Sequence, residues 1–97
     1  MLFVIHAIDK PGDGSARQAN RQAHLTFAAE NADIIKLGGP LLSEDGEKMV
    51  GSMLIIEAKD LATAKAWAAL DPYAVNGVFE SVDIRPYKLV LGTKKFD

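Results

Sequence analysis

Blocks of apolar residues alternate along the chain with polar turns, and their periodicities predict four strands and two helices. The strand-like blocks are rich in β-branched and aromatic residues and are bounded by glycine, proline or other turn formers. They cover residues 2–8, 34–42 (bent at its glycines), 49–58 and 79–91. The helix-like blocks are rich in alanine and contain neither glycine nor proline. They cover residues 16–32 and 61–70.

Several residues predict where these elements begin and end. Ser15 is expected to cap the first helix, and Pro72 to stop the second. In the last strand the apolar positions change phase at Pro86, which predicts a bulge or an edge position there. The tail at 92–97 is expected to be frayed or to make a minor contact.

The order β-α-β-β-α-β predicts the ferredoxin-like split βαβ fold, an α+β sandwich with four antiparallel strands and two helices on one face. The first strand is expected to be central. Phe3 and Ile5 alternate with Val4 and His6, so both sides of this strand carry apolar groups. The bare sheet face therefore needs a cover, which the face-to-face packing of two sheets in a homodimer would supply. His6 is interpreted as a sheet histidine or a dimer-interface residue.

Composition narrows the class of protein. A chain of 97 residues predicts a single domain over 1–97, and 48% hydrophobic with 25% charged residues is typical of a globular fold. The net charge of −2 provides no basic excess for nucleic acid or an anionic membrane. The absence of cysteine excludes disulfides and thiol chemistry. No apolar stretch is long enough to span a bilayer, and an unprocessed cytoplasmic protein is expected.

The first helix carries the most informative polar residues. His24 lies at the border between a polar sector and apolar neighbours, a setting that suits a general base because imidazole titrates near neutrality. Arginines one turn away could hold an anionic substrate. The alternative is a solvated helix face with an incidental histidine. The polar sector contains Arg17, Asn20, Arg21, His24 and Asn31.

Asp71, in the sequence Asp71-Pro72-Tyr73, is the second candidate. A carboxylate at the C-terminal end of a helix is locally unfavourable, because that end carries partial negative charge. One interpretation is a turn former. The other is that Asp71 accepts a hydrogen bond from the imidazole of His24 and orients it. Both helices are expected on the same sheet face, so the contact is possible, although periodicity does not establish it.

Two glycine-containing segments would remove side-chain bulk from one patch of the sheet. They are Gly38-Gly39-Pro40 and Gly51-Ser52, on paired strands. Bare backbone beside Ser52 could admit a ligand or merely permit a bulge, and both interpretations stay open. The chain has no dinucleotide or phosphate-loop motif and no histidine pair at metal-ligand spacing, so neither a cofactor nor a metal is expected. A metal site formed by His24, Asp71 and a third carboxylate remains an open alternative.

An ordered set of short motifs over residues 1–91 resembles the YCII-related family. The motifs are Arg21-Gln22-Ala23-His24, Gly38-Gly39-Pro40, Gly51-Ser52, Ala64 with Trp67, Asp71-Pro72-Tyr73, Gly77-Val78-Phe79 and Ile84-Arg85-Pro86-Tyr87. The resemblance implies a dimeric α+β barrel built from ferredoxin-like protomers. It also implies a cavity that holds a His-Asp pair for acid-base catalysis.

Matched position by position, the family's histidine falls on His24 and its aspartate on Asp71. The family is similar in architecture to muconolactone isomerase-like and dehydrochlorinase proteins. The resemblance thus implies a cofactor-independent lyase or isomerase acting on a small oxygenated or aromatic metabolite. The alternative is a non-catalytic dimer that binds a small ligand in the same cavity. Residues expected to bind the substrate are Arg17, Arg21, Gly39, Pro40, Ser52 and Tyr73.

Overall fold

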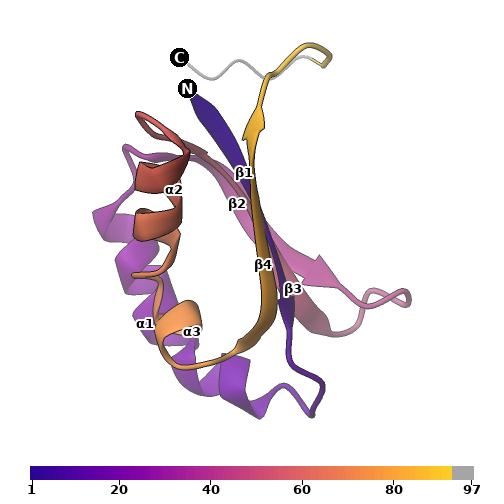
Figure 1. Ribbon diagram of the computed structural model, residues 1–97. Coiled ribbons are helices and arrows are strands. Elements are labelled where there is room, and N and C mark those ends of the chain that lie inside the picture. Colours follow the sequence, from indigo (N-terminus) through magenta and orange to yellow (C-terminus); the bar gives the residue numbers. More distant parts are fainter. Residues whose placement is uncertain (93–97) are drawn as a thin grey trace.

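The computed structural model describes residues 1–92 and contains one antiparallel sheet with strand order β2-β3-β1-β4. Three helices cover one face of the sheet, and the other face is bare (Figure 1). The predicted α+β ferredoxin-like fold is confirmed. The strands are β1 (Leu2–Asp9), β2 (Ile35–Leu42), β3 (Met49–Glu57) and β4 (Phe79–Tyr87). The helices are α1 (Ser15–Glu30), α2 (Leu61–Ala68) and α3 (Pro72–Val75).

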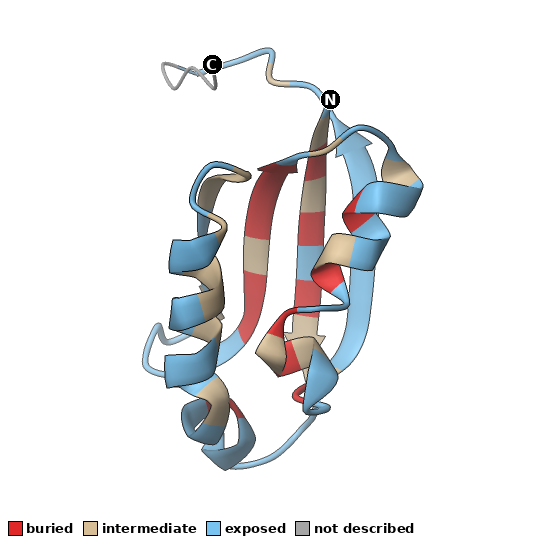
Figure 2. Cartoon of the chain, turned by 90° about the vertical axis from the view of Figure 1, so that its left-hand side faces the viewer, coloured by how far each residue is buried: buried red, intermediate tan, exposed pale blue. Residues whose placement is uncertain are grey.

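The hydrophobic core lies between the sheet and the helices. Figure 2, viewed from the helix side, shows the buried parts of the sheet on its two central strands, β1 and β3. Phe3 and Ile56 are fully buried there and pack with alanines of α2, whose small side chains let that helix lie close to the sheet. The predicted central position of the first strand is confirmed, since β1 pairs with both β3 and β4.

Over the central strands β1 and β3 the outer face of the sheet is also apolar, and the charged Asp83 and Arg85 of β4 border it. Phe3 and Ile5 of β1 face the helices, so alternation places Val4 and the exposed His6 on the bare side. The pairing of Val4 with Ile55 extends this face across β3. The outer face is defined here as Leu2, Val4, His6, Ile8, Leu37, Met53 and Ile55.

The start of α1 differs from the prediction. The N-cap is Gly14, which adopts a left-handed φ of 84°, and it makes no side-chain capping bond. Ser15 is the first helical residue, and its backbone N–H donates to Asp13 at 2.9 Å. The prediction of a Ser15 cap was wrong because the tight turn after Pro11 needs a positive φ, which glycine adopts at low cost.

Pro72 does not end the second helix. Helix α2 stops at Ala68, and Pro72 begins α3, where its fixed φ and missing N–H suit the first turn. In β4, Pro86 pairs with Phe3 in regular register, and the irregularity lies between Ile8 and Asp9. Of the two alternatives for Pro86, a bulge is wrong and an edge strand is confirmed.

The last strand ends at Tyr87, earlier than the predicted 91. The expectation for the tail at 92–97 falls, apart from its first residue, outside the described residues. Within residues 1–92, none of the helices has the length and apolar character required to cross a membrane.

Candidate active site

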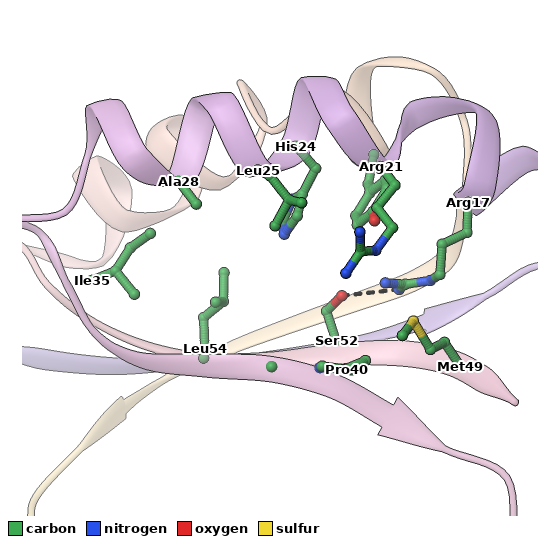
Figure 3. Close-up of a pocket in the computed structure, with 13 residues that line it drawn as sticks. Arg17, Arg21, His24, Leu25, Ala28, Ile35, Pro40, Met49, Ser52 and Leu54 are labelled. Atoms are coloured by element: carbon green, nitrogen blue, oxygen red, sulfur yellow. Dashed lines mark hydrogen bonds between the residues drawn. The ribbon is translucent and has the colours of Figure 1, made fainter. Parts of the chain in front are cut away.

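A cavity of about 280 Å³ lies between α1 and strands β2 and β3 (Figure 3). One end is apolar, between Ala28 on the helix and Leu54 on the sheet, and the other end is polar. Small-molecule sites start at roughly 300 Å³, so this volume suits a single ring. The residues predicted to bind substrate all line it: Arg17, Arg21, Gly39, Pro40, Ser52 and Tyr73.

His24 enters the cavity from α1, and its imidazole is held on two sides. Its Nδ1 lies 2.9 Å from Oδ1 of Asp71, and its ring stacks on Tyr73 with centroids 4.1 Å apart and planes inclined by 12°. The side chains of His24 and Asp71 are only 16% and 5% exposed. Because Nδ1 is directed at a carboxylate, Nε2 is the ring nitrogen left for a ligand.

Asp71 has a different local role from the one expected. It is the N-cap of α3, and the same Oδ1 that meets His24 accepts the backbone N–H of Tyr73 at 3.0 Å. The prediction that Asp71 stands at the unfavourable C-terminal end of a helix was therefore wrong, because α2 has already ended. A carboxylate that satisfies a free N–H at a helix start is locally stabilising.

Arg17 is buried at the polar end of the cavity and is paired with a residue that the sequence analysis missed. Its Nε and Nη2 donate to the two carboxylate oxygens of Asp9 at 2.7 and 2.8 Å. Burial alone would lower the pKa of Arg17, but the hydrogen bonds and charge of Asp9 outweigh burial, so the pKa lies above its ordinary value. Arg17 is thus a fixed cation at all accessible pH.

Tyr73 connects Arg17 with His24. The Arg17 guanidinium lies 4.5 Å from the centre of the Tyr73 ring, and that ring in turn stacks on His24. Burial raises the pKa of Tyr73, and the nearby Arg17 charge only partly opposes this effect. The phenol therefore stays neutral around physiological pH and can act as a hydrogen-bond donor.

Other candidates from the sequence lie away from the cavity. Asn31, expected in the same polar sector, accepts a hydrogen bond from the indole N–H of Trp67 at 3.1 Å and ties α1 to α2. Asn20 donates to the carbonyl of Ala16 in its own helix. Within residues 1–92, no three His, Cys, Asp or Glu side chains gather as a metal-ligand set.

The structure places the two glycine-containing segments in different surroundings, and no register shift falls on their glycines. Gly38, Gly39 and Pro40 line the cavity, and the pairing of β2 with β3 is irregular on either side of them. Gly51 is required by the close approach of a neighbouring strand. A Cβ at this position would lie 2.3 Å from the carbonyl oxygen of Ala7. Gly51 allows β1 and β3 to approach closely next to Ser52.

The apolar lining of the cavity was not among the residues predicted from the sequence. Leu25 and Ala28 follow Arg21 at spacings of four and seven, the helical pattern that places them on its face, so that signal was available. Met49 and Leu54 come from β3, and only the tertiary structure brings them opposite α1.

Comparison with known proteins identifies relatives over nearly the whole chain. The profile of the YCII-related domain family matches residues 1–88. Protein YciI from Escherichia coli O6:H1 is 37% identical over an alignment of length 97. The alignment covers 93% of this chain and 99% of that protein. An uncharacterized protein from Haemophilus influenzae is 34% identical over 97 residues, with the same coverage of both chains.

A solved structure has the same fold. It is the 5-chloro-2-hydroxyhydroquinone dehydrochlorinase TftG from Burkholderia phenoliruptrix AC1100, in complex with 2,5-dihydroxybenzoquinone. It superimposes with a TM-score of 0.82 at 33% identity, and the match covers 91% of this chain and 94% of that chain.

Proposed function

The chain belongs to the YCII-related family, and from this membership and the geometry of its cavity we propose that it is a small enzyme that moves a proton on a single-ring oxygenated metabolite. The family membership confirms the resemblance of the sequence motifs. The proposed reaction class is that of a cofactor-independent lyase or isomerase. His24 is the proposed general acid and base, and Asp71 is the residue that orients it.

The observation that carries this proposal is the fixed imidazole in the cavity wall. Because an ionised carboxylate only accepts, we assign the proton of the 2.9 Å contact with Asp71 to Nδ1 of His24, which leaves the lone pair of Nε2 for a substrate proton. When a C–H or O–H bond of the substrate breaks, the proton goes to Nε2 and the electron pair moves into the ring system. In an isomerisation Nε2 returns the proton to another atom. In an elimination a leaving group such as chloride departs with its bonding electrons.

The charges around the cavity favour an anionic substrate. Arg17 is neutralised by Asp9, whereas Arg21 takes part in none of the salt bridges found among residues 1–92. One positive charge at the polar end thus lacks a protein partner. A ring bearing an ionised hydroxyl would supply the counter-charge.

The likeness to TftG supports a hydroxylated ring as the substrate class. Its name describes elimination of chloride from a hydroxylated ring, and its structure holds a dihydroxybenzoquinone. A one-ring compound of this kind is compatible with a cavity of about 280 Å³. The apolar end would then contact the ring, and the polar end its oxygens.

Two assays under exclusion of air test the proposal. The first follows chloride release from 5-chloro-2-hydroxyhydroquinone, and the second follows exchange of ring hydrogen for deuterium in 2,5-dihydroxybenzoquinone by NMR. We expect the protein to accelerate at least one of these reactions over buffer. Binding of both compounds with no acceleration would contradict catalysis and favour the alternative of a non-catalytic binding protein.

We also propose that two copies of this chain pack through the outer face of the sheet. The face is apolar over its central strands, where Val4 and Met53 stay partly exposed, while Ile55 beside them is already buried within the single chain. An uncovered apolar face of this kind is unfavourable in water. Burial against an identical face would remove it from solvent and form the barrel that the family resemblance implies.

Met53→Glu is expected to weaken this dimer by at least about a hundredfold, because it places an unpaired charge in the interface. Light scattering at micromolar concentration should give twice the mass of one chain for the wild type and a single-chain mass for the variant. Gln22→Glu, on the exposed side of α1, is the matched control and should stay dimeric. A monomeric wild type would contradict the proposal.

A further inference from the structure

Ser52 makes a hydrogen bond that determines how its hydroxyl can act. It lies on β3, is 5% exposed and lines the cavity. Its Oγ accepts from Nη2 of Arg17 at 2.9 Å, the contact drawn as a dashed line in Figure 3. The direction of this bond cannot reverse, because a guanidinium has donors and no acceptor.

The Arg17 guanidinium, which donates to Ser52, is held in place by two further contacts. Arg17 forms a two-point hydrogen bond with Asp9, a geometry that fixes the plane of the guanidinium. The same guanidinium lies over the ring of Tyr73. Arg17 is thereby prevented from turning away from Ser52 when a ligand enters.

The hydroxyl proton of Ser52 is left for a ligand. Among the hydrogen bonds found within residues 1–92, the Oγ of Ser52 is an acceptor only. Arg17 engages one of the two lone pairs of this oxygen, so the O–H points away from that guanidinium, and the open space beside Ser52 is the cavity.

We propose that Asp9, Arg17 and Ser52 form a fixed chain of hydrogen bonds that presents the Ser52 O–H as a donor to an anionic oxygen of the ligand. Ser52 is the residue that touches the ligand, and Arg17 and Asp9 are positioning residues. The inference rests on the proposed function only in placing a small oxygenated ring in this cavity. It adds that the site prefers the ionised form of the ring hydroxyl, because the bond from Ser52 to a charged oxygen is stronger than the bond to a neutral one.

The chemical reason is the strength and direction of the bond. A hydrogen bond to a charged oxygen is about twice as strong as one between neutral groups. Donation from Arg17 also polarises the Ser52 O–H, since chains of hydrogen bonds strengthen one another. On the helix side of the cavity, His24 would hold the proton that the substrate has lost, while Ser52 on the sheet side stabilises the oxygen that carries the charge.

The test uses 4-nitrophenol, a single-ring phenol whose ionised form absorbs visible light. Wild-type protein at saturating concentration is expected to bind the phenolate in preference to the phenol and so to lower the pKa of the bound probe. Ser52→Ala should reduce that preference by about tenfold or more, the effect of losing one hydrogen bond to a charged group. Ser52→Ala keeps the fold because Nη2 of Arg17 retains its bond to Asp9.

Two further variants distinguish the hydrogen bond from Ser52 to the probe from the packing of the probe in the cavity. Ser52→Thr keeps the hydroxyl and should retain the preference for the phenolate. Leu54→Val trims the apolar end of the cavity and should weaken phenol and phenolate equally, without a change in the pKa of the bound probe. The inference is overturned if the wild type does not bind the phenolate preferentially, or if Ser52→Ala preserves the preference. No turnover is involved, so this outcome is distinct from a failure of the two catalytic assays.

Discussion

His24→Gln is expected to lower kcat/KM of the proton-transfer reaction by about 10²- to 10⁴-fold, the usual contribution of a general acid or base. Glutamine can donate to Asp71 in place of Nδ1–H, so the buried carboxylate keeps a partner and the free energy of unfolding should change little. It cannot accept a proton from the substrate. The measurement is initial-rate kinetics on the compound that the wild type converts fastest, alongside chemical unfolding.

Asp71→Asn provides the companion experiment. It should lower the rate by a comparable factor, and the double variant should be little worse than either single one, because the two residues act as a unit. Gln22→Ala, on the exposed side of the same helix, is the control and should keep full activity. Full activity of His24→Gln would rule out the proposed base.

Asp9→Ala is expected to lower the free energy of unfolding by about 3–5 kcal/mol, the cost of leaving a buried charge without its partner. The side chains of Arg17 and Asp9 are 6% and 11% exposed, so the Arg17 charge left without Asp9 would be poorly solvated. Arg17 would also lose the contact that holds it beside Ser52. Urea unfolding of the wild type and of Asp9→Ala measures the difference in the free energy of unfolding. The dependence of that free energy on urea concentration should be the same for both proteins.

The chain contains a matched control for this experiment. Arg85 and Asp83 form an ion pair through one contact, with Nε 2.9 Å from Oδ2, and their side chains are 73% and 58% exposed. Solvent screens such a pair, so Asp83→Ala should leave stability nearly unchanged. Equal losses for Asp9→Ala and Asp83→Ala would show that burial does not set the strength of the Asp9–Arg17 pair.

The fold could be predicted from the sequence because its elements have strong local signals. Strand alternation in residues 2–8 and the helix-forming composition of residues 16–32 are properties of neighbouring residues. Pro72 was misinterpreted because proline is compatible with both the end of one helix and the first turn of the next. Deciding between them requires the packing of α3 against α1, which sequence periodicity does not contain.

The candidate site was predictable only in part. Helical spacing places Arg17, Arg21 and His24 on one face, and the Asp-Pro-Tyr sequence makes Asp71 a candidate, which the family resemblance then pairs with His24. The pairing of Arg17 with Asp9 depends on how the loop from β1 returns to α1, and no periodicity encodes that path. The capping role of Asp71 was missed for the same reason as Pro72, since α3 is only four residues long.

The central claim, that Asp71 holds His24 with Nε2 free to take a proton, is tested most directly by the tautomer of the imidazole. Long-range proton–nitrogen NMR, at a pH where the signals report the neutral ring, distinguishes a proton on Nδ1 from one on Nε2. We predict a proton on Nδ1 of His24 in the wild type and a measurable shift of that proton to Nε2 in Asp71→Ser, which keeps a capping oxygen but is too short to reach the ring. A wild-type imidazole protonated on Nε2, or a tautomer that is the same in both proteins, would contradict the account.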